Sequence, residues 1–83
     1  MLSIINYWVN NGYMRYPSNL AFLRTKAGLS QTELAELASV GQDSISFIER
    51  GLRKPHVRTK RRITIVLSEK LNRFISIDEV FLI

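Results

Sequence analysis

Apolar residues recur at intervals of three and four positions along most of the chain, which is the spacing of one face of an α-helix. A first helix is predicted over residues 3–11, with an apolar face formed by Ile4, Ile5, Trp8 and Val9. A second is predicted from Ser18 or Asn19 to about Ala27. A longer helix would have Thr59 as its N-cap and an apolar stripe of Ile63, Val66, Leu67, Leu71 and Phe74. A last turn is predicted near Ser76, where the alternation of residues also allows a strand.

Ser30 marks the most clearly defined helix start in the sequence. Ser30 and Glu33 form the S-x-x-E pattern of a capping box, in which each side chain binds the backbone N–H of the other residue. Leu29 and Leu34 occupy the positions of a hydrophobic staple across this cap. The helix is predicted to be short, because the "SVG" of residues 39–41 interrupts it.

The stretch "VGQDSISFIERG", residues 40–51, predicts a second short helix with a mixed outer face. Ile45 and Ile48 fall on one side of a helix that begins at Gln42. The opposite side carries an acid, a hydroxyl group, an aromatic ring and a basic group at helical spacing, namely Asp43, Ser46, Phe47 and Arg50. This face is too polar for a core, so we expect it to be exposed.

The pattern predicts a single all-α domain, since no repeat, low-complexity tract or linker divides the 83 residues. We expect a helical N-terminal extension at residues 1–16 and a compact domain of four to five helices at residues 17–83. The chain is 46% hydrophobic, which is enough for a small core without disulfides. Core positions are predicted at Leu20, Leu23, Leu34, Leu37, Ile45, Ile48, Ile63 and Leu67.

The charge of the chain is concentrated in one segment. Twelve Lys and Arg residues against seven acidic residues give a net charge of +5, and seven of the twelve lie in residues 50–62, which contain no acid. A basic cluster of this kind attracts a polyanion, nucleic acid first and an acidic membrane surface second. Taken alone, the cluster fits a solvated helix face equally well.

The composition argues against several classes of function. The chain has no cysteine and a single histidine, His56, so we expect no metal site and no cofactor. No apolar run is long enough to cross a membrane and no signal peptide is recognisable, so a cytoplasmic protein is expected. The absence of a phosphate loop, of G-x-S-x-G and of a histidine–carboxylate motif argues against an enzyme.

Two short helices joined by a three-residue turn form a helix-turn-helix, here at about residues 30–50. In DNA-binding proteins with this arrangement, the second helix lies in the major groove with its N-terminal residues on the base edges. A two-helix corner is common in all-α proteins and carries little weight alone. Together with the mixed face and the basic segment, it predicts a protein that binds double-stranded DNA.

The segment "GLSQTELAELASVGQDSISFIERGLRKP" also resembles the phage Cro and repressor-type helix-turn-helix family, called the XRE family. The usual sequence pattern of the family is similar to G-L-S-Q-x-E-L-A, followed by a turn and by S-x-x-I-S-x-I-E-x-G. The resemblance covers residues 19–67 well and residues 76–82 loosely. It implies a repressor-like fold of four or five helices and binding to operator DNA at the nucleoid, commonly as a two-fold dimer.

The resemblance also assigns roles to individual positions. Gln31 stands where the family holds a phosphate, and Arg24 and Glu49 match a pair that ties the first family helix to the third. Base-reading and groove-edge positions correspond to Gln42, Asp43, Ser44 and Phe47, with Ser46 on the same outer face. The positions that meet the DNA backbone correspond to Arg50, Arg53 and Lys54.

The sequence departs from the family pattern at four places. Ser39 stands where the turn usually has glycine, and Gly41 stands where the second helix usually has a hydroxyl cap, which glycine replaces less well. About six additional residues separate Leu67 from Asp78, which predicts a longer fourth helix. Residues 1–13 lie upstream of the usual family start.

Several residues admit a second interpretation. Phe47 could belong to the core, although its position opposite Ile45 and Ile48 favours exposure. Asp43 could be a partner of the helix dipole, or it could accept a hydrogen bond from a cytosine N4. His56 is expected to be an ordinary loop residue, and Trp8 a core or interface residue.

Three functions are compatible with these patterns. The first is a sequence-specific DNA-binding regulator, in particular a repressor of phage, plasmid or mobile-element type. The second is the DNA-binding antitoxin of a toxin–antitoxin pair, which would have a toxin as protein partner, as a repressor could have an anti-repressor. The third is a protein-interaction module on the same fold, for which DNA binding would be weak and insensitive to salt.

A homodimer is expected, because one helix in the major groove covers too few base pairs to specify a site. The predicted core residues between Leu20 and Leu67 are enough to fill the interior of the domain. The apolar residues near the two chain ends would therefore build the interface. These are Ile4, Ile5, Trp8 and Val9 at one end and Phe74, Ile77, Val80, Phe81 and Leu82 at the other. The alternative is that the two ends pack on each other within one chain.

Overall fold

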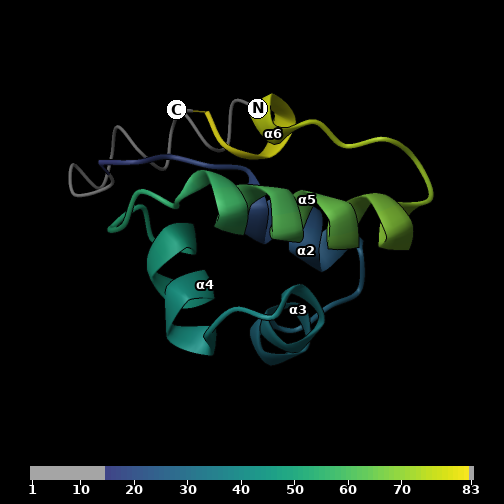
Figure 1. Ribbon diagram of the computed structural model, residues 1–83, viewed down its shortest axis with the longest axis horizontal. Helices are drawn as coiled ribbons and strands as arrows, with labels where there is room; N and C mark the ends of the chain where they lie inside the picture. Colours follow the sequence, from purple (N-terminus) through teal and green to yellow (C-terminus); the bar gives the residue numbers. More distant parts are fainter. Residues whose placement is uncertain (1–14, 83) are drawn as a thin grey trace.

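The computed structural model of the chain describes residues 15–82, and the predicted helix at residues 3–11 lies outside them (Figure 1). The predicted all-α fold is confirmed for the described part. Its helices are α2 (Leu20–Lys26), α3 (Gln31–Ala38), α4 (Gln42–Glu49), α5 (Val57–Leu71) and α6 (Ile77–Val80).

The long helix α5 runs across the middle of the domain, and the shorter helices pack around it (Figure 1). Helices α3 and α4 lie on one side of α5 and contact each other. Helix α6 and the end of the chain lie on the opposite side. Helix α2 contacts both α4 and α5. This arrangement leaves the outer faces of α3 and α4 uncovered by the rest of the described chain.

The core forms where the inward stripes of these helices meet. Seven of the eight predicted core residues are buried, from Leu20 in α2 to Leu67 in α5. Leu37 is the exception, with 51% of its surface exposed. The inward face of α3 is Leu34, Ala35 and Ala38, and at 3.6 residues per turn Leu37 lies roughly 100° from the middle of that stripe. The prediction that Leu37 belongs to the core is therefore wrong.

The predicted capping box of α3 is confirmed. The backbone N–H of Glu33 donates to Ser30 Oγ at 3.0 Å, and the N–H of Ser30 donates to Glu33 Oε1 at 2.8 Å. Hydrogen bonds from the backbone and the hydroxyl of Ser30 lower the pKa of Glu33. The turn after α3 passes through Ser39, which takes the left-handed conformation (φ 57°) that glycine adopts most easily. The guanidinium of Arg62 donates to the carbonyl of Ser39 at 3.2 Å.

Helix α5 begins earlier than the sequence pattern indicated. Its N-cap is His56 and its first residue is Val57, so the prediction of Thr59 as the cap is wrong. Pro55 disfavours a helical conformation in the residue before it, so the helix does not extend back to Lys54. It ends before Asn72, whose left-handed conformation (φ 55°) turns the chain. Phe74 therefore leaves the predicted stripe and is 82% exposed.

The two ends of the described chain pack on each other. The backbone N–H of Asn19 donates to the carbonyl of Val80 at 2.7 Å, and Ser18 forms an isolated antiparallel bridge with Phe81. The predicted final turn is confirmed, with Ser76 Oγ accepting from the N–H of Glu79. Val80 and Phe81 are fully buried, so the prediction that they build a dimer interface is wrong and they complete the core instead.

Candidate nucleic-acid interface

The corner between α3 and α4 is held by backbone hydrogen bonds in the turn and by the packing of α4 on the core. The N–H of Val40 donates to the carbonyl of Ala35 at 2.9 Å, which closes the end of α3. Ile45 and Ile48 are buried beneath α4. The N-cap of α4 is Gly41, which supplies no side-chain cap. The angle between the two helices is therefore set by the turn and the core.

The first turn of α4 faces outward. Gln42 and Asp43 are exposed, and Ser44 and Ser46 are half-buried. Asp43 lies in the first turn, where the N-terminal end of the helix dipole stabilises a negative charge. The backbone N–H groups at this end and the side chain of Gln42 can act as hydrogen-bond donors to a bound molecule. This end of α4 can thus present donors and acceptors side by side.

Phe47 lies beneath two guanidinium groups and is half-buried. The Cζ atoms of Arg50 and Arg53 each lie 4.9 Å from the centre of its ring. Arg53 also donates from Nη1 to Ser44 Oγ at 3.0 Å. Cations at this distance are attracted by the negative face of an aromatic ring. We call these four residues the arginine–phenylalanine cluster.

Arg24 and Glu49 form a two-point ion pair that joins α2 to the end of α4. Arg24 Nε lies 2.6 Å from Glu49 Oε2, and Arg24 Nη2 lies 3.1 Å from Glu49 Oε1. Gln31 Nε2 also donates to Glu49 Oε1 at 3.0 Å, and Arg24 Nη1 donates to the carbonyl of Leu29. The two charged side chains are 17% and 6% exposed. The carboxylate of Glu49 therefore joins α4 to both α2 and α3.

The basic segment of residues 50–62 is not one uniform surface. Arg53 and Lys54 are exposed beside the end of α4, in the loop that leads to α5. Lys60 is only 9% exposed, and its ammonium group lies 5.8 Å from the ring centre of Phe81. Lys60 is therefore directed into the domain, and the sequence pattern did not distinguish it from its neighbours.

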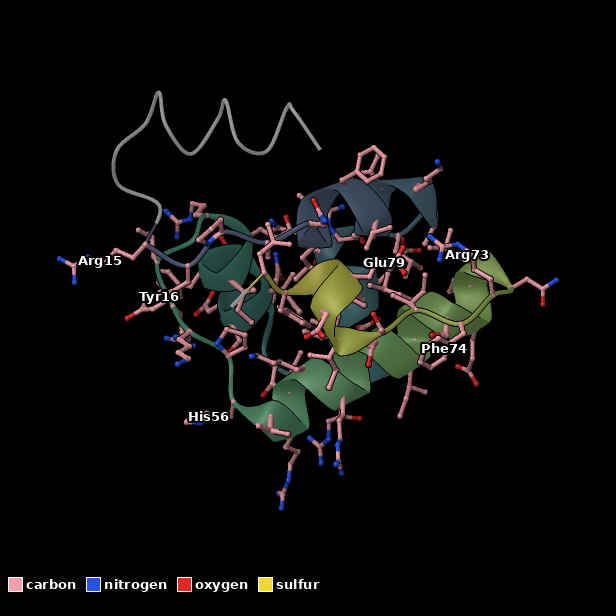
Figure 2. All side chains as sticks on the ribbon, turned by 90° about the horizontal axis from the view of Figure 1, so that it is seen from above. Arg15, Tyr16, His56, Arg73, Phe74 and Glu79 are labelled. Carbon is pink, nitrogen blue, oxygen red and sulfur yellow. The ribbon has the colours of Figure 1, made fainter. Side chains whose placement is uncertain are left out.

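Arg15 is a basic residue that the sequence patterns did not associate with this surface. Its backbone N–H donates to the carbonyl of Gly51 at 3.0 Å, and so does that of Tyr16 at 3.1 Å. Arg15 and His56 both point away from the ribbon (Figure 2). The contact with Gly51 brings a further cation next to the loop that carries Arg53. Nothing in the local sequence indicates it, because it joins residues far apart in the chain.

Residues 15–82 contain neither a cluster of metal ligands nor a membrane-spanning helix. No group of three His, Asp or Glu side chains there could hold a metal ion. None of the helices in residues 15–82 is both long and apolar enough to span a membrane.

Comparison with known proteins identifies a family that covers most of the described residues. A family model described as helix-turn-helix matches residues 20–74, from the start of α2 to just beyond the end of α5. A search of curated proteins finds no match. The matched segment contains the whole corner, the Arg24–Glu49 pair and the arginine–phenylalanine cluster.

Proposed function

The chain belongs to the Cro and repressor-type (XRE) helix-turn-helix family of DNA-binding regulators, and on this basis we propose that it represses transcription from a near-palindromic operator. The observation that carries the proposal is the exposed first turn of α4, with Gln42 and Asp43 outward and Arg53 and Lys54 beside it. In this arrangement α4 enters the major groove and the cations meet phosphates. Such a regulator acts on nucleoid DNA in the cytoplasm and needs no catalytic group.

Two copies are needed for a site of useful length. A single α4 contacts only a few base pairs, whereas two of them about 34 Å apart read one face of the duplex across one helical turn. Selection of bound fragments from random DNA, followed by footprinting, tests the proposal directly. We expect one near-palindrome to be enriched and protected. No enrichment above the starting pool would contradict sequence-specific binding and favour a protein-interaction module on the same fold.

Salt dependence separates phosphate contacts from other roles of the loop cations. The logarithm of affinity falls with the logarithm of salt concentration by about 0.9 for each phosphate neutralised. Arg53→Ala and Lys54→Ala are each expected to weaken binding to all sequences alike and to reduce that slope by about one unit. Titrations at several salt concentrations measure the effect. If neither substitution changes the slope, these residues do not contact phosphates.

Phe47 is expected to act through the arginines that lie over its ring. Phe47→Leu keeps an apolar side chain but removes the aromatic face, which is worth about 0.5–1 kcal/mol for each exposed cation–π contact. We expect weaker binding to all sequences, and a smaller loss when Arg53→Ala is already present. Phe47→Tyr is the control that keeps the ring. Loss of preference at one base pair would instead indicate the direct base contact that the family resemblance implies.

A further inference from the structure

A shallow groove lies between the C-terminal end of α3 and the middle of α5. Its volume is about 250 Å³, and its apolar lining includes Leu37, Ile65 and Val66. Leu37 from α3 and Ile65 from α5 are 51% and 59% exposed. Figure 1 shows the two helices next to each other. Two large aliphatic side chains therefore stay in water although the core of the domain is complete without them.

Charged residues of opposite sign border this groove on α5. Arg62, Ile65 and Glu69 are spaced at i, i+3 and i+7, so they share one face of the helix. Arg62 and Glu69 are separated along the axis by roughly 10 Å, at 1.5 Å per residue. The midpoint between them falls at residues 65–66. The face is therefore positive at one end, apolar in the middle and negative at the other end.

A face with this pattern is complementary to itself under a two-fold rotation. If two α5 helices meet in antiparallel orientation about the midpoint, Arg62 of each copy faces Glu69 of the other, and the two Ile65 side chains meet at the centre. Leu37 of each copy can then pack against the α5 helix of the other. Two-fold dimers require a surface that complements itself in this way.

We propose that a second copy of the chain docks on this α3–α5 face, with the contacts Arg62 to Glu69, Glu69 to Arg62 and Ile65 to Ile65. The proposal rests on the proposed function, since it names the surface of the homodimer. The groove is small, so association in free solution is weak. Binding of two copies to adjacent half-sites raises their effective concentration and completes the dimer on DNA.

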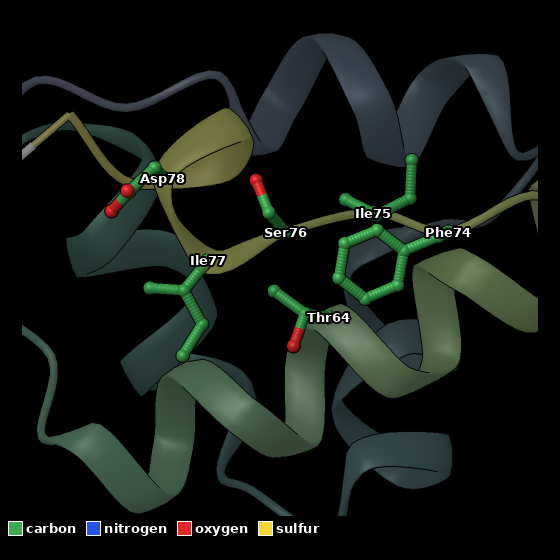
Figure 3. A pocket seen from close by; sticks show the side chains of 6 residues that line it. All are labelled: Thr64, Phe74, Ile75, Ser76, Ile77 and Asp78. Carbon is green, nitrogen blue, oxygen red and sulfur yellow. The ribbon is translucent and has the colours of Figure 1, made fainter.

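A second exposed pocket does not have the same property. It has a volume of about 330 Å³ and lies between α5 and the segment that leads to α6 (Figure 3). Phe74 lines it and is 82% exposed. Asp78 is the only charged residue in its lining, so the pocket contains no pair of opposite charges that a second copy could match. Phe74 therefore provides a control position outside the α3–α5 face.

Charge reversal on α5 tests the proposal with two variants, Arg62→Glu and Glu69→Arg. Each variant alone places like charges opposite each other twice in its own dimer. A mixture of the two variants places an acidic face against a basic face, so both contacts are attractive. We expect the mixture to associate at least about tenfold more tightly than either variant alone. Sedimentation equilibrium or a titration followed by nuclear magnetic resonance measures the three association constants.

The mixture also controls for effects within one copy. Arg62 donates to the carbonyl of Ser39, so Arg62→Glu can lower stability, but lower stability does not make the mixture associate more tightly than the separate variants. Ile65→Ser is expected to weaken self-association of the wild-type face, and Phe74→Ser to leave it unchanged. If the mixture associates no more tightly than either variant, the α3–α5 face is not the dimer interface. Binding of the wild-type protein to a single half-site tests the DNA-binding function independently of that outcome.

Discussion

Arg24→Ala is expected to lower the free energy of unfolding by about 3–5 kcal/mol, because it leaves the carboxylate of Glu49 buried without its cation. The side chain of Glu49 is 6% exposed. Without Arg24 it would keep only the hydrogen bond from Gln31. A loss of this size is a large part of the 5–15 kcal/mol that stabilises a typical small domain. Urea unfolding followed by circular dichroism measures it.

Two further variants show whether burial is the cause. The double substitution Arg24→Met with Glu49→Leu removes both charges, and we expect it to cost less than Arg24→Ala alone. Arg73→Ala breaks an ion pair with Glu79 of the same length, 2.6 Å, but these side chains are 52% and 36% exposed. We expect Arg73→Ala to change stability little, because water screens exposed charges. Equal losses from Arg24→Ala and Arg73→Ala would contradict the role assigned to burial.

The exposed pair between Arg73 and Glu79 also has a defined pH dependence. The hydrogen bond from Arg73 lowers the pKa of Glu79. A carboxyl group whose pKa is lower in the folded state stabilises the fold above its unfolded pKa, and this contribution is lost as the pH falls through the folded value. Any contribution from this pair therefore disappears in acid and is constant at neutral pH.

Gln42→Ala is expected to remove discrimination at one base pair of the operator by about 1–3 kcal/mol. The side chain of Gln42 is exposed in the first turn of α4. A glutamine amide can donate from Nε2 to N7 of adenine and accept at Oε1 from the N6 amino group, a pairing that no other base offers in the same geometry. The loss should appear at a single base pair of the operator, because the other residues of α4 make their contacts independently of Gln42.

A panel of operators with single base-pair changes measures this effect. Wild-type protein should prefer adenine at one position, and Gln42→Ala should bind all four bases there with similar affinity. Arg53→Ala is the matched control, since a phosphate contact weakens all operators equally. A uniform loss for Gln42→Ala would indicate that α4 had been destabilised, which thermal unfolding of the free variant would reveal.

Local patterns were sufficient for features that depend on residues close together in the chain. The capping box joins Ser30 and Glu33, which are three residues apart, so the residue types alone identify it. The burial of Ile45 and Ile48 follows from one helical period within a single short helix. The family pattern also consists of residue types at fixed spacings along the chain, so the sequence alone identifies it. The matched residues 20–74 include the whole helix-turn-helix.

Features that depend on which neighbour a helix face meets could be learned only from the packed domain. Leu37 was predicted to lie in the core and is exposed, whereas Lys60 belongs to the basic segment and is buried beside Phe81. Periodicity identifies an apolar stripe but not its exact centre, and a shift of one position along the helix turns a side chain by about 100°. Phe74 left its predicted stripe because one left-handed residue, Asn72, turned the chain before it.

The features of the candidate site also fall into two groups, those that the local sequence predicts and those that depend on the packed domain. Residue types and spacing place Gln42, Asp43 and Phe47 on the outer side of α4, because one helix positions all three. The contacts of Arg53 with Phe47 and Ser44, and of Arg15 with Gly51, join separate segments of backbone. Such contacts depend on the paths of the loops, and loop paths follow from packing of the whole domain, which the order of residues in one segment does not reveal.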